Sequence, residues 1–146
     1  MRWQTLVVLA AGFLVAADEP KDDAVKKEWK ALQGNWTVVS IEVNGTKVPE
    51  DKIGGREAAF KGDQYSIHDF RLVVKIDPTK KPKTMDMDGK DGNGKPLSMT
   101  GIYELSGDTL KICFAKPGTK ERPVQFKTRP KTGESLIVYK RRRERQ

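Results

Sequence analysis

The sequence predicts an all-β protein, an eight-stranded antiparallel up-and-down barrel preceded by one short helix. Three observations predict this fold. Apolar and polar residues alternate along about eight short stretches, turn-forming residues separate these stretches at nearly regular intervals, and only one stretch has helical spacing. A meander of this kind can close on itself and so remove its exposed edges. A two-sheet sandwich is the alternative, because alternation alone does not distinguish the two architectures.

Residues 1–17 have the pattern of a secretory signal peptide. Arg2 provides a positive start, an uncharged apolar run covers residues 6–17, and the small residues that end at Ala17 precede a polar stretch from Asp18. The run is short for a membrane span, which disfavours the alternative of an uncleaved anchor. We therefore expect cleavage after Ala17 and export to the periplasm or the extracellular medium.

Residues 18–33 combine an acidic linker with the predicted helix. Val25, Trp29 and Leu32 fall at positions i, i+4 and i+7, which places them on one apolar stripe. Gly34 is suited to end the helix, and beyond it the apolar spacing changes to a period of two.

The predicted barrel covers residues 34–141, and a basic tail covers residues 142–146. The alternating stretches are residues 37–43, 57–61, 64–68, 72–76, 84–88, 97–105, 110–114 and 135–140. Their alternation predicts an inward-facing set: Val39, Ile41, Val43, Phe60, Tyr65, Ile67, Leu72, Val74, Ile76, Met85, Met87, Met99, Tyr103, Leu105, Leu110, Ile112, Phe114, Leu136 and Val138.

Several motifs resemble a known family. The stretch 32–40, with Gly34 and Trp36, looks like the opening of a lipocalin-type barrel, in which a short helix leads into Gly-x-Trp on the first strand. Further motifs lie at residues 44–49, 60–65, 76–86, 101–105, 107–114 and 122–123. Together they resemble small exported lipocalin-like domains of unknown function that are abundant in planctomycete bacteria. This resemblance covers residues 32–141 and implies an eight-stranded barrel and export, with no established activity.

The resemblance also implies a structural plug at the closed end of the barrel. In lipocalins the Gly-x-Trp tryptophan lies beneath a cation from the last strand. Trp36 matches that tryptophan, and Arg141 is the implied counterpart. A guanidinium stacked over an indole shields both groups from water, so we expect a structural role for this pair.

Catalytic and metal-binding motifs fail on spacing or on composition. One His and one Cys exclude a multi-histidine metal centre and an internal disulfide framework. The acidic, glycine-rich stretch 86–94 lacks the carboxylate spacing of a calcium loop, so we expect a hairpin there. His68 next to Asp69 has no nucleophile tied to it, and Cys113 is expected to be packed and inert. We expect no enzymatic activity, no metal and no cofactor.

Two functional hypotheses remain open at this point. In the first, the barrel binds a small apolar ligand among Met85, Met87, Met99 and Tyr103, because methionines form an adaptable lining. In the second, a monomeric, non-enzymatic interaction module docks on an anionic polymer or lipid surface of the cell envelope through its basic face. The net charge is +8, and the C-terminal run 140–145 is the densest basic stretch. Nucleic acid is not expected, because the chain is predicted to be exported and no aromatic residues interleave with that run.

Overall fold

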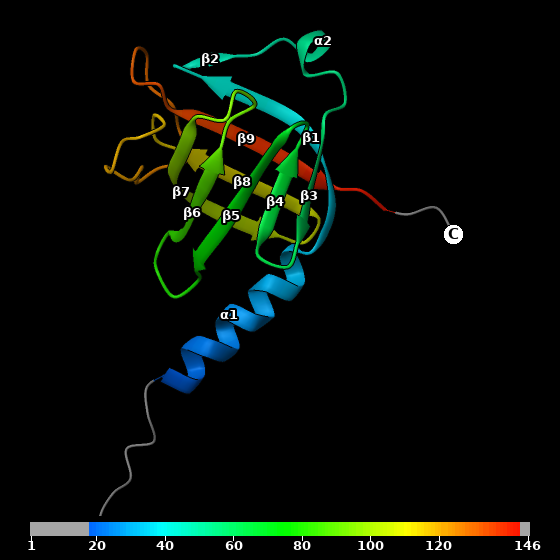
Figure 1. Cartoon of the computed structure of the whole chain (residues 1–146), viewed down its shortest axis with the longest axis vertical. Helices are drawn as coiled ribbons and strands as arrows, with labels where there is room; N and C mark the ends of the chain where they lie inside the picture. Colours follow the sequence, from blue (N-terminus) through cyan, green and yellow to red (C-terminus); the bar gives the residue numbers. More distant parts are fainter. Residues whose placement is uncertain (1–17, 144–146) are drawn as a thin grey trace, which may run out of the picture.

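The computed structural model describes residues 18–143. The predicted signal peptide, residues 1–17, and the end of the basic tail, residues 144–146, lie outside the described residues. Helix α1 (Asp18–Leu32) occupies the stretch that was expected to hold the linker and the helix, and it extends from one end of the sheet (Figure 1). Within residues 18–143, no helix is both long and apolar enough to cross a bilayer.

Eight strands form a closed antiparallel barrel, which confirms the predicted fold class. Each barrel strand pairs with the next, and β1 pairs with β9 to close the sheet. The barrel strands are β1 (Gly34–Val43), β3 (Glu57–Lys61), β4 (Gln64–Ile67), β5 (Phe70–Asp77), β6 (Lys83–Lys90), β7 (Pro96–Ser106), β8 (Thr109–Phe114) and β9 (Ser135–Arg141). Two short elements that were not among the predicted stretches, β2 (Thr46–Lys47) and α2 (Glu50–Ile53), lie between β1 and β3.

The inward face of the barrel carries most of the predicted core. Buried members of the predicted set are Phe60, Tyr65, Leu72, Val74, Met85, Met87, Tyr103, Leu110, Ile112 and Phe114. Partly buried members that pack against this core are Ile41, Ile67, Ile76, Met99 and Leu105. Prediction works for these strands because successive side chains of a strand point to opposite faces of the sheet.

Strand β1 departs from the predicted alternation. A bulge between Val38 and Ser40 shifts its register against β9. Such an extra residue changes which positions face inward. Trp36 and Val38 are buried, whereas Val39 is 41% exposed and Val43 is 36% exposed. The prediction that Val39 faces inward was therefore wrong. Val43 lies beyond the bulge on the same face as Ile41, as predicted, but it is half-exposed at the end of the strand.

Strand β9 has the opposite parity to the predicted one. Tyr139 pairs directly with the inward residue Leu110, and directly paired residues of antiparallel strands share a face. Tyr139 is buried, and Ile137 packs against the core beside it. The predicted inward residues Leu136 and Val138 therefore face outward. Both faces of β9 carry apolar residues, so alternation alone could not choose between them.

Apolar side chains cover both ends of the barrel. Trp29 and Leu32 of α1 pack against the core at one end, next to Trp36. Ile53 of α2 is buried in the same core, and Val48 packs against it. Because α1 and α2 lie at opposite ends of the barrel, the core is covered at both ends (Figure 1).

The connection between β8 and β9, residues 115–134, has neither helix nor strand and is called the long loop below. It begins along β7, where the backbone N–H groups of Ala115 and Gly118 donate to strand carbonyls over 2.9 Å each. Buried apolar side chains in the loop and on the outer wall of the barrel are Ile102, Cys113, Ala115 and Pro123. The loop is thus fixed against the barrel from its first turn onwards.

Candidate functional site

The four residues proposed to bind an apolar ligand lie in the packed barrel core. Met85, Met87 and Tyr103 are at most 1% exposed, and Met99 is partly buried. Met87 and Met99 are direct partners across β6 and β7, whereas Met85 faces Gly101. Three pockets that the described residues form are lined by none of these four side chains.

Polar groups inside the barrel satisfy one another. The hydroxyl oxygens of Tyr65 and Tyr139 lie 2.8 Å apart, and burial raises the pKa of Tyr65 to about 12. The Tyr103 hydroxyl donates to Glu28 over 3.0 Å, and burial followed by the Glu28 charge raises the pKa of Tyr103. Lys83 contacts the same Glu28 oxygen over 2.8 Å. The contacts of Glu28 with Tyr103 and Lys83 tie α1 to the barrel. Burial keeps the tyrosine hydroxyls un-ionised at neutral pH.

The predicted plug is present in the structure. The Arg141 guanidinium carbon lies 4.3 Å from the centroid of the Trp36 ring, and the indole N–H donates to the Leu32 carbonyl over 2.9 Å. Arg141 also donates to the carbonyls of Gln33, over 2.9 Å, and of Ala31. All these partners are groups of the protein itself, so the plug serves the fold.

The long loop is the strongest candidate for a functional surface. Loops beyond about 12–15 residues without secondary structure are uncommon in compact domains and usually functional or disordered. This loop spans residues 115–134 and is fixed to the barrel. It carries six basic residues against two acidic ones: Lys116, Lys120, Arg122, Lys127, Arg129 and Lys131 against Glu121 and Glu134.

Two carboxylates from distant strands hold the loop in place. Asp86 of β6 accepts two hydrogen bonds from the Arg122 guanidinium, over 2.7 and 3.2 Å, and the same guanidinium donates to the Gly101 carbonyl over 2.7 Å. Glu42 of β1 accepts from the Thr128 hydroxyl over 2.5 Å. Charge-assisted bonds of this kind are the stronger class of hydrogen bond.

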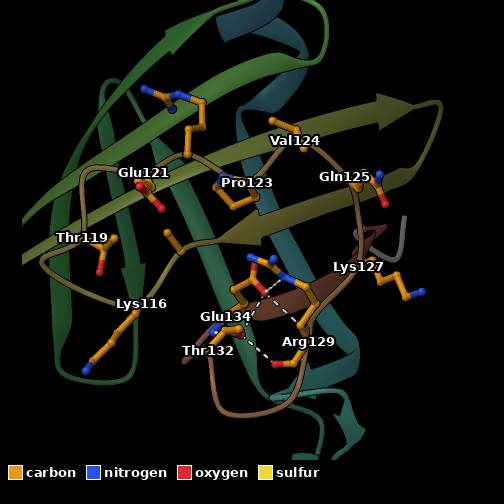
Figure 2. A pocket seen from close by; sticks show the side chains of 12 residues that line it. Lys116, Thr119, Glu121, Pro123, Val124, Gln125, Lys127, Arg129, Thr132 and Glu134 are labelled. Atoms are coloured by element: carbon orange, nitrogen blue, oxygen red, sulfur yellow. Dashed lines mark hydrogen bonds and ion pairs between the residues drawn. The ribbon is translucent and has the colours of Figure 1, made fainter.

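A third carboxylate, Glu134, organises the loop from within (Figure 2). It accepts from the Arg129 backbone N–H and side-chain Nε over 3.2 and 3.1 Å, and from the Thr132 hydroxyl over 2.8 Å. Burial alone would raise the pKa of Glu134, but the bonds from Arg129 and Thr132 outweigh burial and hold that pKa below its ordinary value. At neutral pH the Glu134 carboxylate is therefore charged, and it is hydrogen-bonded to Arg129 and Thr132.

Two pockets open beside the loop. The first, of about 460 Å³, is lined within the loop by Lys116, Lys127, Arg129 and Glu134 among others (Figure 2). The second, of about 550 Å³, lies between the loop and the turn that precedes β6. Both volumes fall in the range of small-ligand sites. The pockets share three loop residues, Arg122, Pro123 and Val124.

Five lysines surround these two pockets. Lys116 and Lys127 line the first pocket, and Lys75, Lys80 and Lys81 line the second. All five are exposed, and none forms an ion pair with a residue in the part of the chain that the structure describes. We call these five residues the lysine ring. Two of the acids that line the pockets are engaged by arginines, Asp86 by Arg122 and Glu134 by Arg129.

The remaining candidate residues lie apart from this surface or beneath it. His68 is exposed in the turn between β4 and β5, with a φ of 49°. Cys113 is buried on the outer wall, its Sγ lies 3.7 Å from the Lys127 carbonyl, and burial raises the pKa of its thiol. The predicted hairpin after β6 is present, with Asp91 accepting from the backbone N–H groups of Asn93 and Lys95. Among residues 18–143, no three metal-binding side chains gather in one place.

Sequence analysis pointed to the basic run 140–145 and did not identify the lysine ring. The available signal was the interval of residues 115–134, which lacks alternation and is rich in lysine, glycine and proline. What the sequence could not indicate is which basic residues lack acidic partners. The comparisons with family models, curated proteins and solved structures found no match. The class defined by the structure is thus an antiparallel β-barrel with a fixed, lysine-rich outer loop.

Proposed function

We propose that this protein is a non-enzymatic interaction module that binds an anionic partner through the long loop and the lysine ring. The observation that carries the proposal is that five exposed lysines surround two pockets without forming an ion pair among the described residues. An unpaired basic face attracts polyanions and accelerates their association. If residues 1–17 act as a signal peptide, this partner belongs to the cell envelope or to the extracellular medium.

The charges around the two pockets support the proposal of an anionic partner. Arg122 and Arg129 neutralise Asp86 and Glu134, so these four groups contribute little net field. The remaining acids that line the pockets are Glu121 and Asp77, and Asp77 accepts hydrogen bonds from the N–H and hydroxyl of Thr79. The lysine ring therefore dominates the charge that this face presents to a partner.

The apolar-ligand hypothesis has less support. Its four residues pack in a core that is covered at both ends, and the two pockets beside the long loop lie on the outer wall. A ligand inside the barrel would have to displace side chains that already fill the interior. The outer face needs no such rearrangement to receive a partner.

Binding to inorganic polyphosphate of defined length tests the proposal, with neutral dextran as the uncharged control. We expect saturable binding that weakens steeply between 50 and 200 mM salt, because ions screen exposed charges and counterions are released on binding. The variant Lys116→Gln/Lys127→Gln keeps long polar side chains and removes two charges. It should lower the slope of log affinity against log salt by about 2.

The matched control is Lys52→Gln/Lys61→Gln, which removes two exposed lysines that line neither pocket of the long loop. It lowers the net charge equally and should change the salt slope far less. No binding to polyphosphate would overturn the proposal. Equal loss of slope in the two double variants would also overturn it, because binding would then follow net charge and not this face.

A further inference from the structure

An exposed apolar residue lies in the middle of the basic face. Val124 is 76% exposed, whereas the other exposed large hydrophobic residues of the described chain, Val39, Val43 and Val73, are 36–47% exposed. Phe126, two residues further along the loop, is only partly buried. Single exposed apolar residues are common on protein surfaces, so the surroundings of Val124 decide whether it has a role.

The structure holds Val124 outward on a fixed support. The preceding Arg122 is bound by Asp86 and by the Gly101 carbonyl, and Pro123 is buried against the wall. The side chain of Val124 is therefore presented to solvent by a stretch of backbone that cannot readily turn it inward. Presenting an apolar group in this way costs free energy, since exposed apolar surface orders water.

Val124 also lies between the two halves of the lysine ring. It lines both pockets, and Lys80 and Lys81 belong to one pocket while Lys116 and Lys127 belong to the other. Figure 2 shows Lys116 and Lys127 on opposite sides of the first pocket, with Val124 at its upper edge. An apolar tip surrounded by cations matches a surface that is anionic at its boundary and apolar just below it.

We propose that the long-loop face docks on an anionic lipid bilayer. Val124 enters the boundary between headgroups and acyl chains, and the lysine ring contacts the lipid phosphates. This inference rests on the proposed function, of which it specifies the partner. A soluble polyanion would use the lysines equally well, but it offers no apolar layer to receive Val124. Interfacial binding combines burial of apolar surface with attraction to anionic headgroups.

Partitioning into vesicles tests the inference on the mature chain. Vesicles of phosphatidylcholine alone are compared with vesicles that contain one third phosphatidylglycerol, and polyphosphate binding is measured in parallel. We expect binding to the anionic vesicles only. Lys116→Gln/Lys127→Gln should weaken that binding by about fivefold for each lysine removed.

The variant Val124→Ser distinguishes a bilayer from a soluble polymer. It should lower vesicle partitioning about tenfold, because a valine side chain leaves the apolar layer, and should leave polyphosphate affinity unchanged. Val39→Ser is the matched control, since it removes an exposed valine that lines neither pocket of the long loop, and its vesicle partitioning should equal that of the wild type.

The outcomes separate the two proposals. If polyphosphate binds but anionic vesicles do not, or if Val124→Ser partitions like the wild type, the bilayer inference is overturned and the proposed function stands. If polyphosphate does not bind, the proposed function fails, and the bilayer inference, which rests on it, fails as well. Equal partitioning into neutral and anionic vesicles would overturn the inference, because the lysine ring would then play no part.

Discussion

The two basic regions of this molecule differ in what their cations contact. At the C-terminal end, Arg142 lies 2.7 Å from Glu57, and Arg143 lies 2.6 Å from Asp108, which Arg141 also approaches to 3.5 Å. The lysines of the ring around the long loop form no ion pair with an acid among residues 18–143. The region with the denser charge in sequence is thus the one whose described arginines are already paired.

This difference separates structural cations from available ones. The hydrogen bond from Arg143, with the charges of Arg143 and Arg141, holds the pKa of Asp108 below its ordinary value, although its slight desolvation acts the other way. An arginine in such an ion pair must break that pair before it can bind an anionic partner. The lysines of the ring lose only bound water and counterions. Charge density in sequence is therefore a weaker guide to a binding face than the absence of ion pairs.

Removing the plug should produce the largest effect. Trp36 is fully buried beneath Arg141, and truncating a buried aromatic side chain typically costs about 3–5 kcal/mol. Trp36→Ala should therefore lower the free energy of unfolding by about that amount, measured by chemical denaturation. A small domain of about 5–10 kcal/mol total stability would be close to unfolding. An unchanged denaturation midpoint would contradict the packing of the closed end.

The next largest effect should come from Arg141. Arg141→Gln removes the stacking on Trp36 and the charge-assisted bonds to the carbonyls of Ala31 and Gln33. We expect a loss of about 2–3 kcal/mol of stability. The salt slope of polyphosphate binding should stay that of the wild type, measured on the folded fraction. A reduced slope would place Arg141 in the binding face and break the distinction between the two regions.

The sequence predicted the barrel because alternation depends on local chemistry. In the strands from β3 to β8, one side chain in two is apolar and faces the core, so a period of two is visible without any structure. The alternation failed in β1, where one extra residue at the bulge changes the parity. It failed in β9 as well, because Ile137 and Val138 are both apolar. Only pairing with Ile112 shows that Ile137 faces inward.

The candidate site was harder to predict because its determinants are distant in sequence. Thr128 is held by Glu42, which lies 86 residues earlier, and Arg122 is held by Asp86, 36 residues earlier. These pairs decide the course of the loop and which cations remain unpaired. Trp36 and Arg141 are also far apart in sequence, and they were predicted to pair only because residues 32–40 resemble the opening of a lipocalin-type barrel. Without such a motif, side-chain pairing between remote segments leaves no local pattern.

Glu134 should have an intermediate effect, exerted through the long loop. Glu134→Gln weakens the bonds from Arg129 and Thr132 and should lower the local stability of the loop by about 1–2 kcal/mol. Cys113 reports on this change, because it is the one cysteine of the chain and lies buried next to Lys127. Its alkylation at neutral pH should become up to about tenfold faster. Glu121→Gln, which changes an exposed glutamate of the same loop, is the control and should leave the rate unchanged.

The pH dependence of the same variant has a definite sign. Since the pKa of Glu134 is lower in the folded protein than in the unfolded chain, its contribution to stability is fully present above the unfolded pKa. The contribution is lost as the pH falls through the folded pKa. The melting temperatures of the wild type and Glu134→Gln should therefore differ at neutral pH and converge in acid. A difference that grows as the pH falls would contradict this assignment.

The smallest effect should come from the outermost arginines. The side chains of Arg142 and Arg143 are 54% and 83% exposed, and such surface pairs contribute about 0–1 kcal/mol to stability. Arg142→Gln/Arg143→Gln should therefore leave the melting temperature nearly unchanged.

This variant also compares the two basic regions most directly, because it removes as much charge as Lys116→Gln/Lys127→Gln. Both arginines are held by acids of the barrel, so the salt slope of polyphosphate binding should change by well under one unit, against about 2 for the lysine variant. Removing the two arginines makes the field two charges less positive, but next to Glu57 and Asp108, beyond the end of β9 that lies opposite to its junction with the long loop. A fall in slope equal to that of the lysine variant would make the C-terminal arginines part of the binding surface and remove the distinction on which the proposed site depends.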